Sequence, residues 1–404
     1  MINIKYDNNI ISFEKLEDFY SWLLKDKNYN KELVVDYKKA NDLYLFFKFY
    51  ISIKNECFSN LEEFNNTFFD DNDNYHVTDA MSELVRMNSD GKFLRAFLIA
   101  LGYKTFSKSD DNKYLPLASA YETFQTSILI HDDIIDNADI RRGKFTIHSS
   151  YNNRFSEYNN SDIFTKRRAH ISNSLGLCIG DLGFYLANKI ILDNYKDDKE
   201  LHRILSLYNK IVINTIKGEI IDVILPFNAQ YGNSNTTIDD VMEIYKLKTA
   251  WYSIIGPYSL GMTLSGESDE NISKMEDFLS NLGLAFQLKD DILGIFGDEN
   301  VIGKSALSDA IEFKQTILYA YLANNDKDRL KELNKYYGNE SIKEEDLYKI
   351  KKIFEESGAY KYSVETMEKL FDNSKNLLNK INFISQEYKD ILSGFIEYLD
   401  LRKK

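Results

Sequence analysis

The segment LIHDDIIDNADIRRG places three aspartates at the end of an apolar run and two arginines just beyond it: Asp132, Asp133, Asp136, Arg141 and Arg142. Residues i and i+4 share a face of a helix, so Asp132 and Asp136 are expected to point the same way. Two carboxylates this close on an apolar helix are costly unless a cation binds them. Mg²⁺ prefers carboxylate oxygens and often bridges to a substrate phosphate, and arginine binds phosphate oxygens bidentately. The segment therefore predicts metal-assisted binding of a phosphorylated ligand.

A second acidic pair lies in LGLAFQLKDDILGIFGD, where Gln287, Asp290 and Asp291 follow another apolar run with helical spacing. One acidic triplet alone is often only the solvated end of a helix. Two such clusters that face each other across a cavity would instead form a multi-metal clamp for a diphosphate. The pair of clusters is therefore much more specific than either one alone.

Helical elements must position these clusters. Only three prolines and 18 glycines occur in 404 residues, so long uninterrupted helices are expected and a turn-rich β architecture is not. Apolar residues recur at helical spacing over 115–138, 170–195, 203–225, 241–264 and 273–296. Several of these segments are apolar nearly all round, which indicates helices buried among other helices. The sequence predicts an all-α fold, a single-domain bundle of about ten helices around a central cavity.

The composition excludes several classes of protein. The formal net charge of -13 argues against a nucleic-acid-binding surface, because neutralising a phosphate backbone needs an excess of Lys and Arg. Cys57 and Cys178 lie far apart without metal-binding spacing, so neither a disulfide framework nor a zinc site is expected. The N-terminus resembles neither a secretory signal nor a transit peptide, and no run approaches the roughly 18 apolar residues of a membrane span. We expect a cytoplasmic protein without a membrane span.

From about residue 85 to the C-terminus, the chain resembles the farnesyl and geranylgeranyl diphosphate synthase family. The motifs that carry the resemblance are SDGKFLR, HDDIIDNADIRRG, YKLKTAWY, FQLKDDILGIFGD and GKSALSDAIEFKQT. The resemblance implies a bundle of the isoprenoid synthase type, about three Mg²⁺ ions per active site, and a homodimer. It makes 85–404 the catalytic domain, and residues 1–84 are expected to form an N-terminal helical segment packed on the core.

By this resemblance, separate groups of residues bind the two substrates and the metal. Isopentenyl diphosphate is bound by Gly91, Lys92, Arg95, Gln125 and Arg142. The allylic diphosphate is contacted by Arg141, Lys248 and Thr249, and the substrate site is completed by Gln287, Lys304 and Lys314. The metal ligands are Asp132, Asp136 and Asp290. The motif that contains Lys304 and Lys314 also supplies Asp309, and the C-terminal LRKK is similar to a basic tail that closes over the isopentenyl site.

The chemistry that this implies is ionisation of the allylic C–O bond, attack by the isopentenyl double bond, and loss of a proton. Charge on the leaving diphosphate is stabilised by bound Mg²⁺ with Arg141, Lys248 and Lys314. No protein nucleophile is needed, and the aromatic faces of Tyr252 and Phe286 are expected to shield the allylic cation. The residues expected to carry catalysis are Asp132, Asp133, Asp136, Arg141, Lys248, Asp290 and Lys314.

Two positions depart from the family pattern. Gly294 stands where many relatives have a third aspartate, although Asp290 is kept. Glu219 stands where relatives often have a glutamine, which leaves Asp222 as the safer match to the family. Because an acid replaces an amide there, no site role is assigned to Glu219.

Product length should depend on what blocks the growing chain as it runs down the helix away from Asp132. Residues four and five positions earlier are Ile128 and Ser127, where farnesyl-making relatives often have bulky aromatic residues. The small Ser127 is expected to leave room for a longer chain at the end of the cavity. Phe124, one turn deeper, is the candidate residue that stops the chain. The expected product is geranylgeranyl diphosphate, with farnesyl diphosphate also released or, alternatively, the sole product.

Rival functions differ in the residues they require. A terpene cyclase needs no second diphosphate pocket, whereas Lys92, Arg95 and Gln125 are all present. Squalene and phytoene synthases have patterns that differ from HDDIIDNADIRRG. A non-catalytic regulatory subunit of a heteromeric prenyl synthase can lose one acidic motif, and here both remain except for Gly294. Assay of the purified chain alone separates these alternatives.

Overall fold

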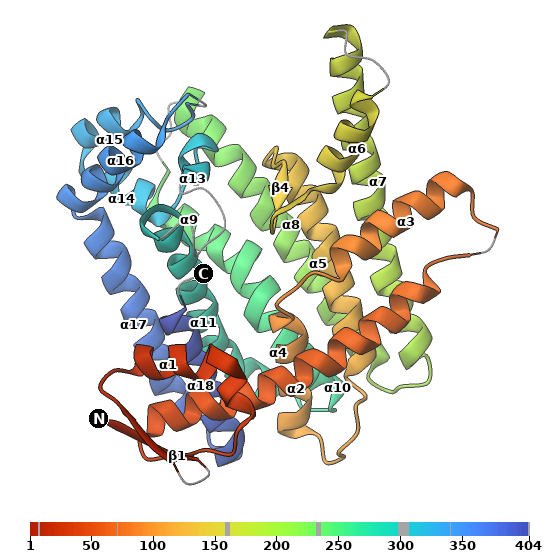
Figure 1. Cartoon of the computed structure of the whole chain (residues 1–404), viewed down its shortest axis with the longest axis vertical. Coiled ribbons are helices and arrows are strands. Elements are labelled where there is room, and N and C mark those ends of the chain that lie inside the picture. Colours follow the sequence, from red (N-terminus) through yellow and green to blue (C-terminus); the bar gives the residue numbers. More distant parts are fainter. Residues whose placement is uncertain are drawn as a thin grey trace.

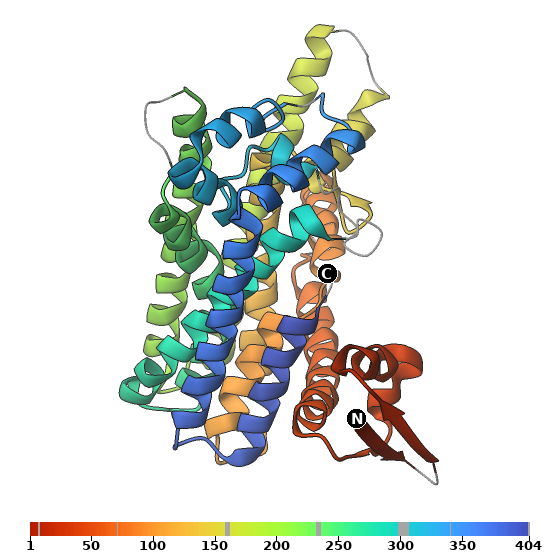
Figure 2. The same ribbon diagram turned by 90° about the vertical axis from the view of Figure 1, so that its left-hand side faces the viewer.

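A computed structural model of the chain describes residues 1–6, 9–70, 72–157, 162–231, 236–297, 307–339 and 341–402. Helices make up most of it, as Figures 1 and 2 show. Their bounds are α1 (Leu16–Leu24), η1 (Lys25–Asn30), α2 (Lys38–Thr67), α3 (Tyr75–Asn88), α4 (Leu94–Phe106), α5 (Leu115–Ile135), α6 (Ile147–Ser156), α7 (Asp162–Tyr195), α8 (Leu201–Tyr231), α9 (Ile238–Ile244), η2 (Tyr245–Ile255), α10 (Gly256–Leu264), α11 (Asp269–Phe296), α13 (Ser308–Ile311), α14 (Ile317–Asn325), α15 (Lys327–Leu333), α16 (Glu344–Glu356), α17 (Ala359–Lys380) and α18 (Gln386–Leu401).

The predicted all-α fold is confirmed, with more helices than the ten or so expected. The additional ones are mostly short helices, such as α13, α15 and α9. Helices α13 to α16 contribute to a small apolar cluster of their own, beside the ends of α11 and α17. Segments of four to nine residues are too short to show a convincing helical period in a sequence, which is why they were not anticipated.

Helix α5 carries the first acidic cluster and is buried on nearly all sides. It has Pro116 in its first turn, where the missing N–H costs no hydrogen bond, and it ends where the N–H of Asp136 donates to the Asp132 carbonyl (2.8 Å). Its long neighbour is α7, and the two helices approach closely at Gly183. A Cβ at Gly183 would lie 2.2 Å from Ser127 Oγ, so only glycine fits there.

Helix α11 carries the second acidic cluster, and η2 lies between α11 and α8. The segment η2 is a run of π-helical turns, a wide geometry that is frequent at functional sites. It approaches α8 at Gly218, where a Cβ would lie 2.5 Å from the backbone nitrogen of Lys248. This contact fixes Lys248 between the two helices that carry acidic side chains.

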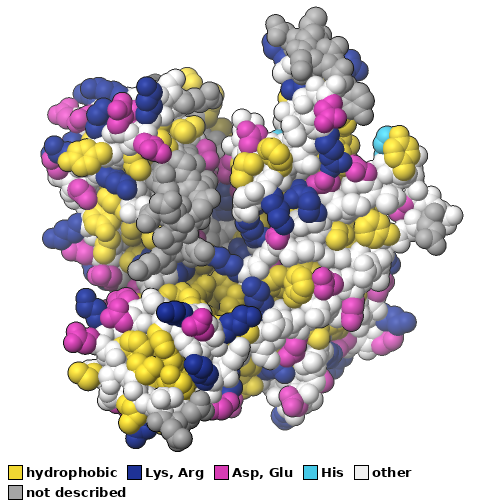
Figure 3. Space-filling model, in the orientation of Figure 1, with side chains coloured by type: hydrophobic (Ala, Val, Ile, Leu, Met, Phe, Trp, Pro, Cys, Tyr) yellow, Lys and Arg dark blue, Asp and Glu magenta, His cyan; other side chains and the backbone are white. Residues whose placement is uncertain are grey.

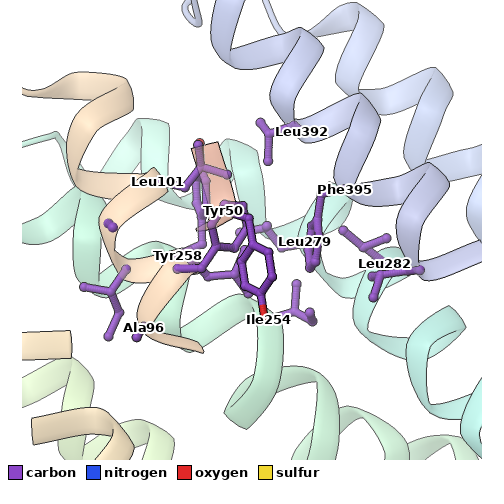
Figure 4. Packing of buried hydrophobic residues seen from close by; sticks show 14 of the residues in the cluster. Tyr50, Ala96, Leu101, Ile254, Tyr258, Leu279, Leu282, Leu392 and Phe395 are labelled. Carbon is purple, nitrogen blue, oxygen red and sulfur yellow. The ribbon is translucent and has the colours of Figure 1, made fainter. Parts of the chain in front are cut away.

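The main core lies where α2, α4, η2, α10, α11 and α18 meet. Figure 4 shows side chains from these segments packed together, among them Tyr50, Leu101, Tyr258, Leu279 and Phe395. Burial of each such side chain stabilises the fold by about 1.5–3 kcal/mol. The core thus holds segments far apart in the sequence in fixed relative positions, and the site residues extend from these same helices.

The first residues of the chain differ from the helical segment expected over 1–84. A three-stranded antiparallel sheet, in the order β2-β1-β3, is formed by β1 (Ile2–Tyr6), β2 (Asn9–Phe13) and β3 (Val34–Val35). In β1, Ile2 and Ile4 are buried and Lys5 is exposed, which is the alternation of a strand with one packed face. The period of two in INIKY was the available signal. Helices α1, α2 and α3 account for most of the remaining residues up to 84.

A short hairpin follows α5 and consists of β4 (Ile140–Arg141) and β5 (Lys144–Phe145). Arg142 and Gly143, at its tip, have positive φ angles of 53° and 76°. The turn reverses the chain immediately after the first acidic cluster. It thereby returns Arg141 toward Asp132 and Asp133.

Within the described ranges, one helix is long and apolar enough to cross a membrane by length and composition alone. It is the stretch Phe164–Tyr195 of α7, with a mean hydropathy of 1.5 in its most apolar window, of which 39% is buried. Buried helices of bundles pass the same test, and α7 packs along α5 and α6. The finding is therefore weak evidence for a membrane span.

Candidate active site

The first acidic cluster is held by Arg141. Its Nε donates to Asp133 Oδ1 (2.6 Å) and its Nη2 to Asp132 Oδ2 (2.9 Å). Burial raises the pKa of Asp133 to about 6, although Arg141 opposes this shift. Burial likewise raises the pKa of Asp136 to about 6, opposed by Lys314 and reinforced by Asp132. The cluster therefore resists carrying its full negative charge without additional positive charge.

The second cluster is tied together by side-chain hydrogen bonds. Asp291 is 7% exposed and accepts from the Tyr245 hydroxyl and from Gln287 Nε2 (2.7 Å). Thr249 Oγ1 in turn donates to Gln287 Oε1 (2.7 Å). Burial raises the pKa of Asp291 to about 8, with Tyr245 opposing and Asp309 reinforcing the shift. These contacts fix the second cluster and leave its neighbour Asp290 more exposed.

Lys248 joins three acidic side chains from two helices. Its Nζ lies 2.6 Å from Asp222 Oδ2, 2.8 Å from Glu219 Oε2 and 3.6 Å from Asp132 Oδ1. Burial acts to lower the pKa of Lys248, but the surrounding carboxylates outweigh it and hold the pKa above its usual value. Lys248 is therefore charged, and Glu219 is accommodated because it pairs with this ammonium.

Lys314 occupies a matching place on the other side. Its Nζ lies 2.9 Å from Glu312 Oε2 and 3.8 Å from both Asp136 Oδ2 and Asp309 Oδ1. A Cβ at Gly294 would lie 2.4 Å from Asp309 Oδ2, so the Asp309 carboxylate rests directly against α11. An aspartate at position 294 would therefore displace the Asp309 carboxylate from its place beside Lys314.

Both clusters line one cavity of about 320 Å³. Its wall includes Asp132 from α5, Asp290 and Asp291 from α11, and Lys248 from η2. Other wall residues are Asp222, Thr249, Gln287, Gly294, Asp309 and Lys314. Figure 3 shows Lys and Arg side chains on the rim of a recess that lies beside β4 in this view. Aspartates of both clusters and two lysines, from distant segments, thus face one space.

Residues assigned to isopentenyl diphosphate gather around a buried acid. Arg95 donates from Nη2 to Ser253 Oγ (2.7 Å), and its guanidinium lies 4.0 Å from the centre of the Tyr252 ring. Burial raises the pKa of Glu122, while Arg95 and Arg142 oppose the shift, which places both guanidinium groups near this carboxyl. Gly91 also adjoins Glu122, since a Cβ there would lie 3.7 Å from Glu122 Oε2.

Lys92 and Gln125 complete this group. Lys92 lies in the loop before α4, where its carbonyl accepts from the Tyr50 hydroxyl. Gln125 is on α5 and is 9% exposed. Arg142 follows Arg141 in the hairpin, and burial, together with repulsion from Arg141, lowers its pKa. The structure therefore brings the cationic side chains Arg95 and Arg142 together on one side of α5.

A second, larger cavity of about 950 Å³ lies between α5, α7 and α8 and is mainly apolar. Asp132 lines both cavities, so the second begins at the acidic cluster. Its wall includes Ile128, Phe184, Tyr208, Val212 and Ile216. A prenyl chain attached to a diphosphate at Asp132 would have apolar surroundings here.

Ser127 does not lie where the chain-length argument required. It faces Gly183 of α7 instead of the cavity, and it is fully buried. Ile128, one residue later, does line the cavity. Phe124 lies behind the wall, with its ring 5.7 Å from that of Phe184 and 5.4 Å from that of Tyr208. We call Phe124, Phe184 and Tyr208 the aromatic floor.

The two aromatic residues expected to shield an allylic cation already contact guanidinium groups. The guanidinium of Arg95 lies over the Tyr252 ring. The guanidinium of Arg402 lies over the Phe286 ring, 4.1 Å from the ring centre. A ring face that interacts with a guanidinium is not available to a carbocation. The shielding role therefore applies at most to the opposite faces of these rings.

Several residues of the site were missed or undervalued in the sequence. Glu122 lies three positions before Gln125 in an apolar helix, and a buried acid there was a detectable signal. Tyr245 begins the YKLKTAWY motif but has no recognisable spacing to Asp291. Arg402 belongs to the C-terminal LRKK that was expected to close over the isopentenyl site, but its contact with Asp290, 112 residues away in the sequence, is not visible in any local pattern. Lys304, assigned to substrate binding, lies outside the described residues.

The donor set suits a hard divalent cation such as Mg²⁺. Carboxylate oxygens face the cavity from α5 and α11, and Asp133 Oδ2 is buried without a hydrogen-bond partner. No three His, Cys, Asp or Glu side chains in the described part of the chain are close enough to hold a metal by themselves. A cation at this position would therefore need water or phosphate oxygens as further ligands, which is usual for Mg²⁺.

An all-helical fold with facing carboxylate clusters, and an apolar cavity leading away from them, defines a class of enzymes that bind diphosphates of apolar chains. The sequence profile of the polyprenyl synthetase family matches residues 76–356. The chain belongs to this family, which makes it a prenyltransferase that elongates prenyl chains.

Individual relatives agree with this assignment. The chain is 28% identical to a short chain isoprenyl diphosphate synthase of Methanocaldococcus jannaschii over 271 residues, which is 67% of this chain and 74% of that protein. It is 27% identical to a geranylgeranyl diphosphate synthase of Sulfolobus acidocaldarius over 319 residues, covering 78% and 88%. The fold is similar to that of a geranylgeranyl pyrophosphate synthase from Corynebacterium glutamicum, solved with isoprenyl diphosphate and magnesium (TM-score 0.76, 24% identity, 88% of this chain and 99% of that chain).

Proposed function

We propose that the chain condenses isopentenyl diphosphate head to tail with dimethylallyl, geranyl or farnesyl diphosphate, and that geranylgeranyl diphosphate is its main product. One observation carries this proposal: Asp132 and Asp290, from α5 and α11, line the same cavity, and Asp132 also begins the large apolar cavity. A site with this arrangement accepts a diphosphate at one end and an apolar chain at the other.

One set of residues would hold Mg²⁺, and a second set would stabilise the leaving diphosphate. Asp132, Asp136 and Asp290 would hold Mg²⁺, about three ions by family resemblance, which supplies Lewis-acid stabilisation of the leaving diphosphate. Lys248 and Lys314 stay protonated and place fixed positive charge beside the same cavity. Arg141, which here binds Asp132 and Asp133, is near enough to exchange these carboxylates for phosphate oxygens.

The residues assigned to isopentenyl diphosphate would bind that substrate, and the apolar cavity would hold the prenyl chain of the allylic substrate. Arg95 and Arg142 would bind the isopentenyl diphosphate, with Lys92 and Gln125 beside them, so that its double bond is held against the allylic carbon. The buried Nε of Arg95 has no hydrogen-bond partner, which suits a ligand oxygen. The apolar wall excludes water from the allylic cation and so favours carbon–carbon bond formation over hydrolysis.

Geranylgeranyl diphosphate as the product is supported by the large volume of the apolar cavity, about 950 Å³, and by the geranylgeranyl diphosphate synthases among the relatives. Phe124, the member of the aromatic floor on α5, is eight residues before Asp132, or about 12 Å along a helix. Between Ile128 and Asp132, α5 has no phenylalanine, tyrosine or tryptophan that would close the cavity earlier. We therefore assign the aromatic floor, which includes the predicted stop Phe124, as the end of the cavity.

We also propose a homodimer formed through α7 and α8. These helices expose a group of large apolar side chains: Leu177, Tyr185 and Leu192 on α7, and Ile213, Ile216, Ile220, Val223, Ile224 and Phe227 on α8. An exposed apolar face of this extent is unusual for a monomer. Ile216, Ile220, Val223 and Ile224 also line the apolar cavity, so a second copy on this face would shield the prenyl chain from solvent.

The test of the proposed function is an assay of the purified chain alone. Labelled isopentenyl diphosphate is supplied with each allylic primer in turn, with Mg²⁺ or with EDTA, and the products are dephosphorylated and separated by chromatography. The proposal expects Mg²⁺-dependent incorporation that ends mainly at the 20-carbon product. Absence of incorporation with every primer would identify a non-catalytic subunit, and a 15-carbon end product would identify a farnesyl diphosphate synthase. Light scattering at several concentrations measures the oligomeric state, and Ile220→Asp should give monomers.

A further inference from the structure

The last described residue, Arg402, reaches into the candidate active site. Its side chain donates from Nη2 to Asp290 Oδ1 (2.6 Å) and to the Phe286 carbonyl (3.0 Å). The residue is 5% exposed, and its Nε is buried without a hydrogen-bond partner. A buried guanidinium with an unused donor beside an acidic cavity is suited to bind a phosphate oxygen that enters there.

The position of Arg402 is set by the end of α18. The backbone N–H of Arg402 donates to the Tyr398 carbonyl (3.0 Å), so Arg402 continues the last turn of this helix. Tyr398 is stacked on Phe46 of α2 (ring centres 5.1 Å apart), and Phe46 is stacked on Tyr50 (5.5 Å). Tyr50 also donates to the carbonyl of Lys92, which is assigned to isopentenyl diphosphate. The same aromatic stack therefore adjoins both Arg402 and Lys92.

The N-terminal unit, which we define as residues 1–6 and 9–37, covers this stack from outside. Figures 1 and 2 show it beside α2 and below the C-terminal end of α18. Tyr20 of α1 makes an edge contact with Tyr398 (6.4 Å) and a tilted contact with Phe47 (5.9 Å), and Phe47 also contacts Tyr398 (5.6 Å). Tyr398 is thus enclosed between α1 and α2.

The positive charge of Arg402 affects the pKa of Tyr20. Burial and Tyr398 raise the pKa of Tyr20 to about 12, and Arg402 opposes this shift. The N-terminal unit also lies outside residues 76–356, the part of the chain that matches the family. Tyr20, outside the matched residues, therefore contacts Tyr398 of α18, the helix that places Arg402 in the site.

We propose that the N-terminal unit braces the end of α18, and that Tyr20 is a positioning residue that holds Arg402 in the candidate active site. This inference rests on the proposed function, because Arg402 belongs to the LRKK tail that the family resemblance places over isopentenyl diphosphate. Tyr20 acts only through Tyr398 and Arg402 and does not contact substrate.

The test compares Tyr20→Ala with Tyr20→Phe, Arg402→Gln and a matched control, Tyr6→Ala. Tyr6 belongs to the same unit but packs on Trp22 (5.7 Å), within the unit. We expect Tyr20→Ala to raise the KM for isopentenyl diphosphate about 3- to 10-fold, the range for residues that act through a neighbour. The kcat and the KM for farnesyl diphosphate should stay near their wild-type values. Tyr20→Phe, which keeps the ring, should behave like the wild type.

A double variant separates positioning from general stability. If Tyr20 acts through Arg402, then adding Tyr20→Ala to Arg402→Gln should raise the KM no further than Arg402→Gln alone. An unchanged KM in Tyr20→Ala, an additive double variant, or an equal effect of Tyr6→Ala would each overturn the proposal. Failure of the wild-type chain to turn over would instead refute the proposed function, so the two failures are distinguishable.

Discussion

Replacing Tyr208 by alanine should lengthen the prenyl product. Tyr208 projects from α8 into the apolar cavity wall and is 1% exposed. Its ring contacts Phe124, the residue behind the wall, so its removal extends the cavity toward Phe124. Phe184 would remain as part of the aromatic floor. The added depth should admit at least one further five-carbon unit.

The magnitude follows from apolar burial. Five carbons buried at about 0.8 kcal/mol each give roughly 4 kcal/mol in favour of the longer intermediate, an upper limit because Phe184 still narrows the space. The substitution also removes packing, and the stability loss should be about 3 kcal/mol, near the low end for a large aromatic residue, since one side of the ring already faces a cavity. The Tyr208 hydroxyl has no hydrogen-bond partner, so no partner is left unsatisfied.

Product chromatography after incubation with labelled isopentenyl diphosphate and farnesyl diphosphate measures the effect. The matched control is Tyr208→Phe, which keeps the ring and removes only the unpartnered hydroxyl, so its product should not change. The reasoning is refuted if Tyr208→Ala turns over with the wild-type product distribution, or if Tyr208→Phe lengthens the product as much as alanine does.

Three further predictions concern packing and charge. Ser127→Phe should lower the melting temperature, because the larger side chain meets Gly183 of α7 and overpacking costs about 1–3 kcal/mol; a stable variant with a shorter product would contradict this placement. Gly294→Asp should likewise lower the melting temperature and kcat, because its side chain would displace the Asp309 carboxylate from beside Lys314, and unchanged values would contradict this reasoning. Without divalent cations, stability should fall as pH rises from about 4 to 8, because native Asp291, with a pKa of about 8, keeps a proton that the unfolded chain releases near pH 4. Thermal melts in EDTA at several pH values test this prediction. Asp291→Asn should flatten the dependence of melting temperature on pH, and a melting temperature that rises over this interval would contradict the prediction.

The charge arrangement explains why the site tolerates its departures from the family pattern. Glu219 adds an acid beside Asp222, but Lys248 lies within 2.8 Å of both. Gly294 removes a carboxylate from α11, but Asp309 occupies the space that it leaves. In both cases the balance of charge across the cavity is kept by a residue from another segment. Neither compensation is visible in the motif that contains the change.

Local patterns in the sequence were sufficient for the main features of the fold and the site. The helical period of α5 and α11 follows from backbone hydrogen bonds that span four residues, so the spacing of Asp132 and Asp136 determined that they share a helix end. The same argument identified the helical fold class. The period of two in the first strand was equally local and was overlooked because only five residues carry it.

Tertiary packing decided which side of each helix faces the cavity. Ser127 and Ile128 are adjacent, yet one meets Gly183 and the other lines the apolar cavity, because the rotation of α5 is set by its contact with α7. Tyr208 and Arg402 reach the site from helices that lie far from Asp132 in the sequence. Such contacts depend on how helices pack against one another, and short-range spacing carries no record of that packing. The sequence therefore determined the chemical groups, and the tertiary structure determined the shape of the space between them.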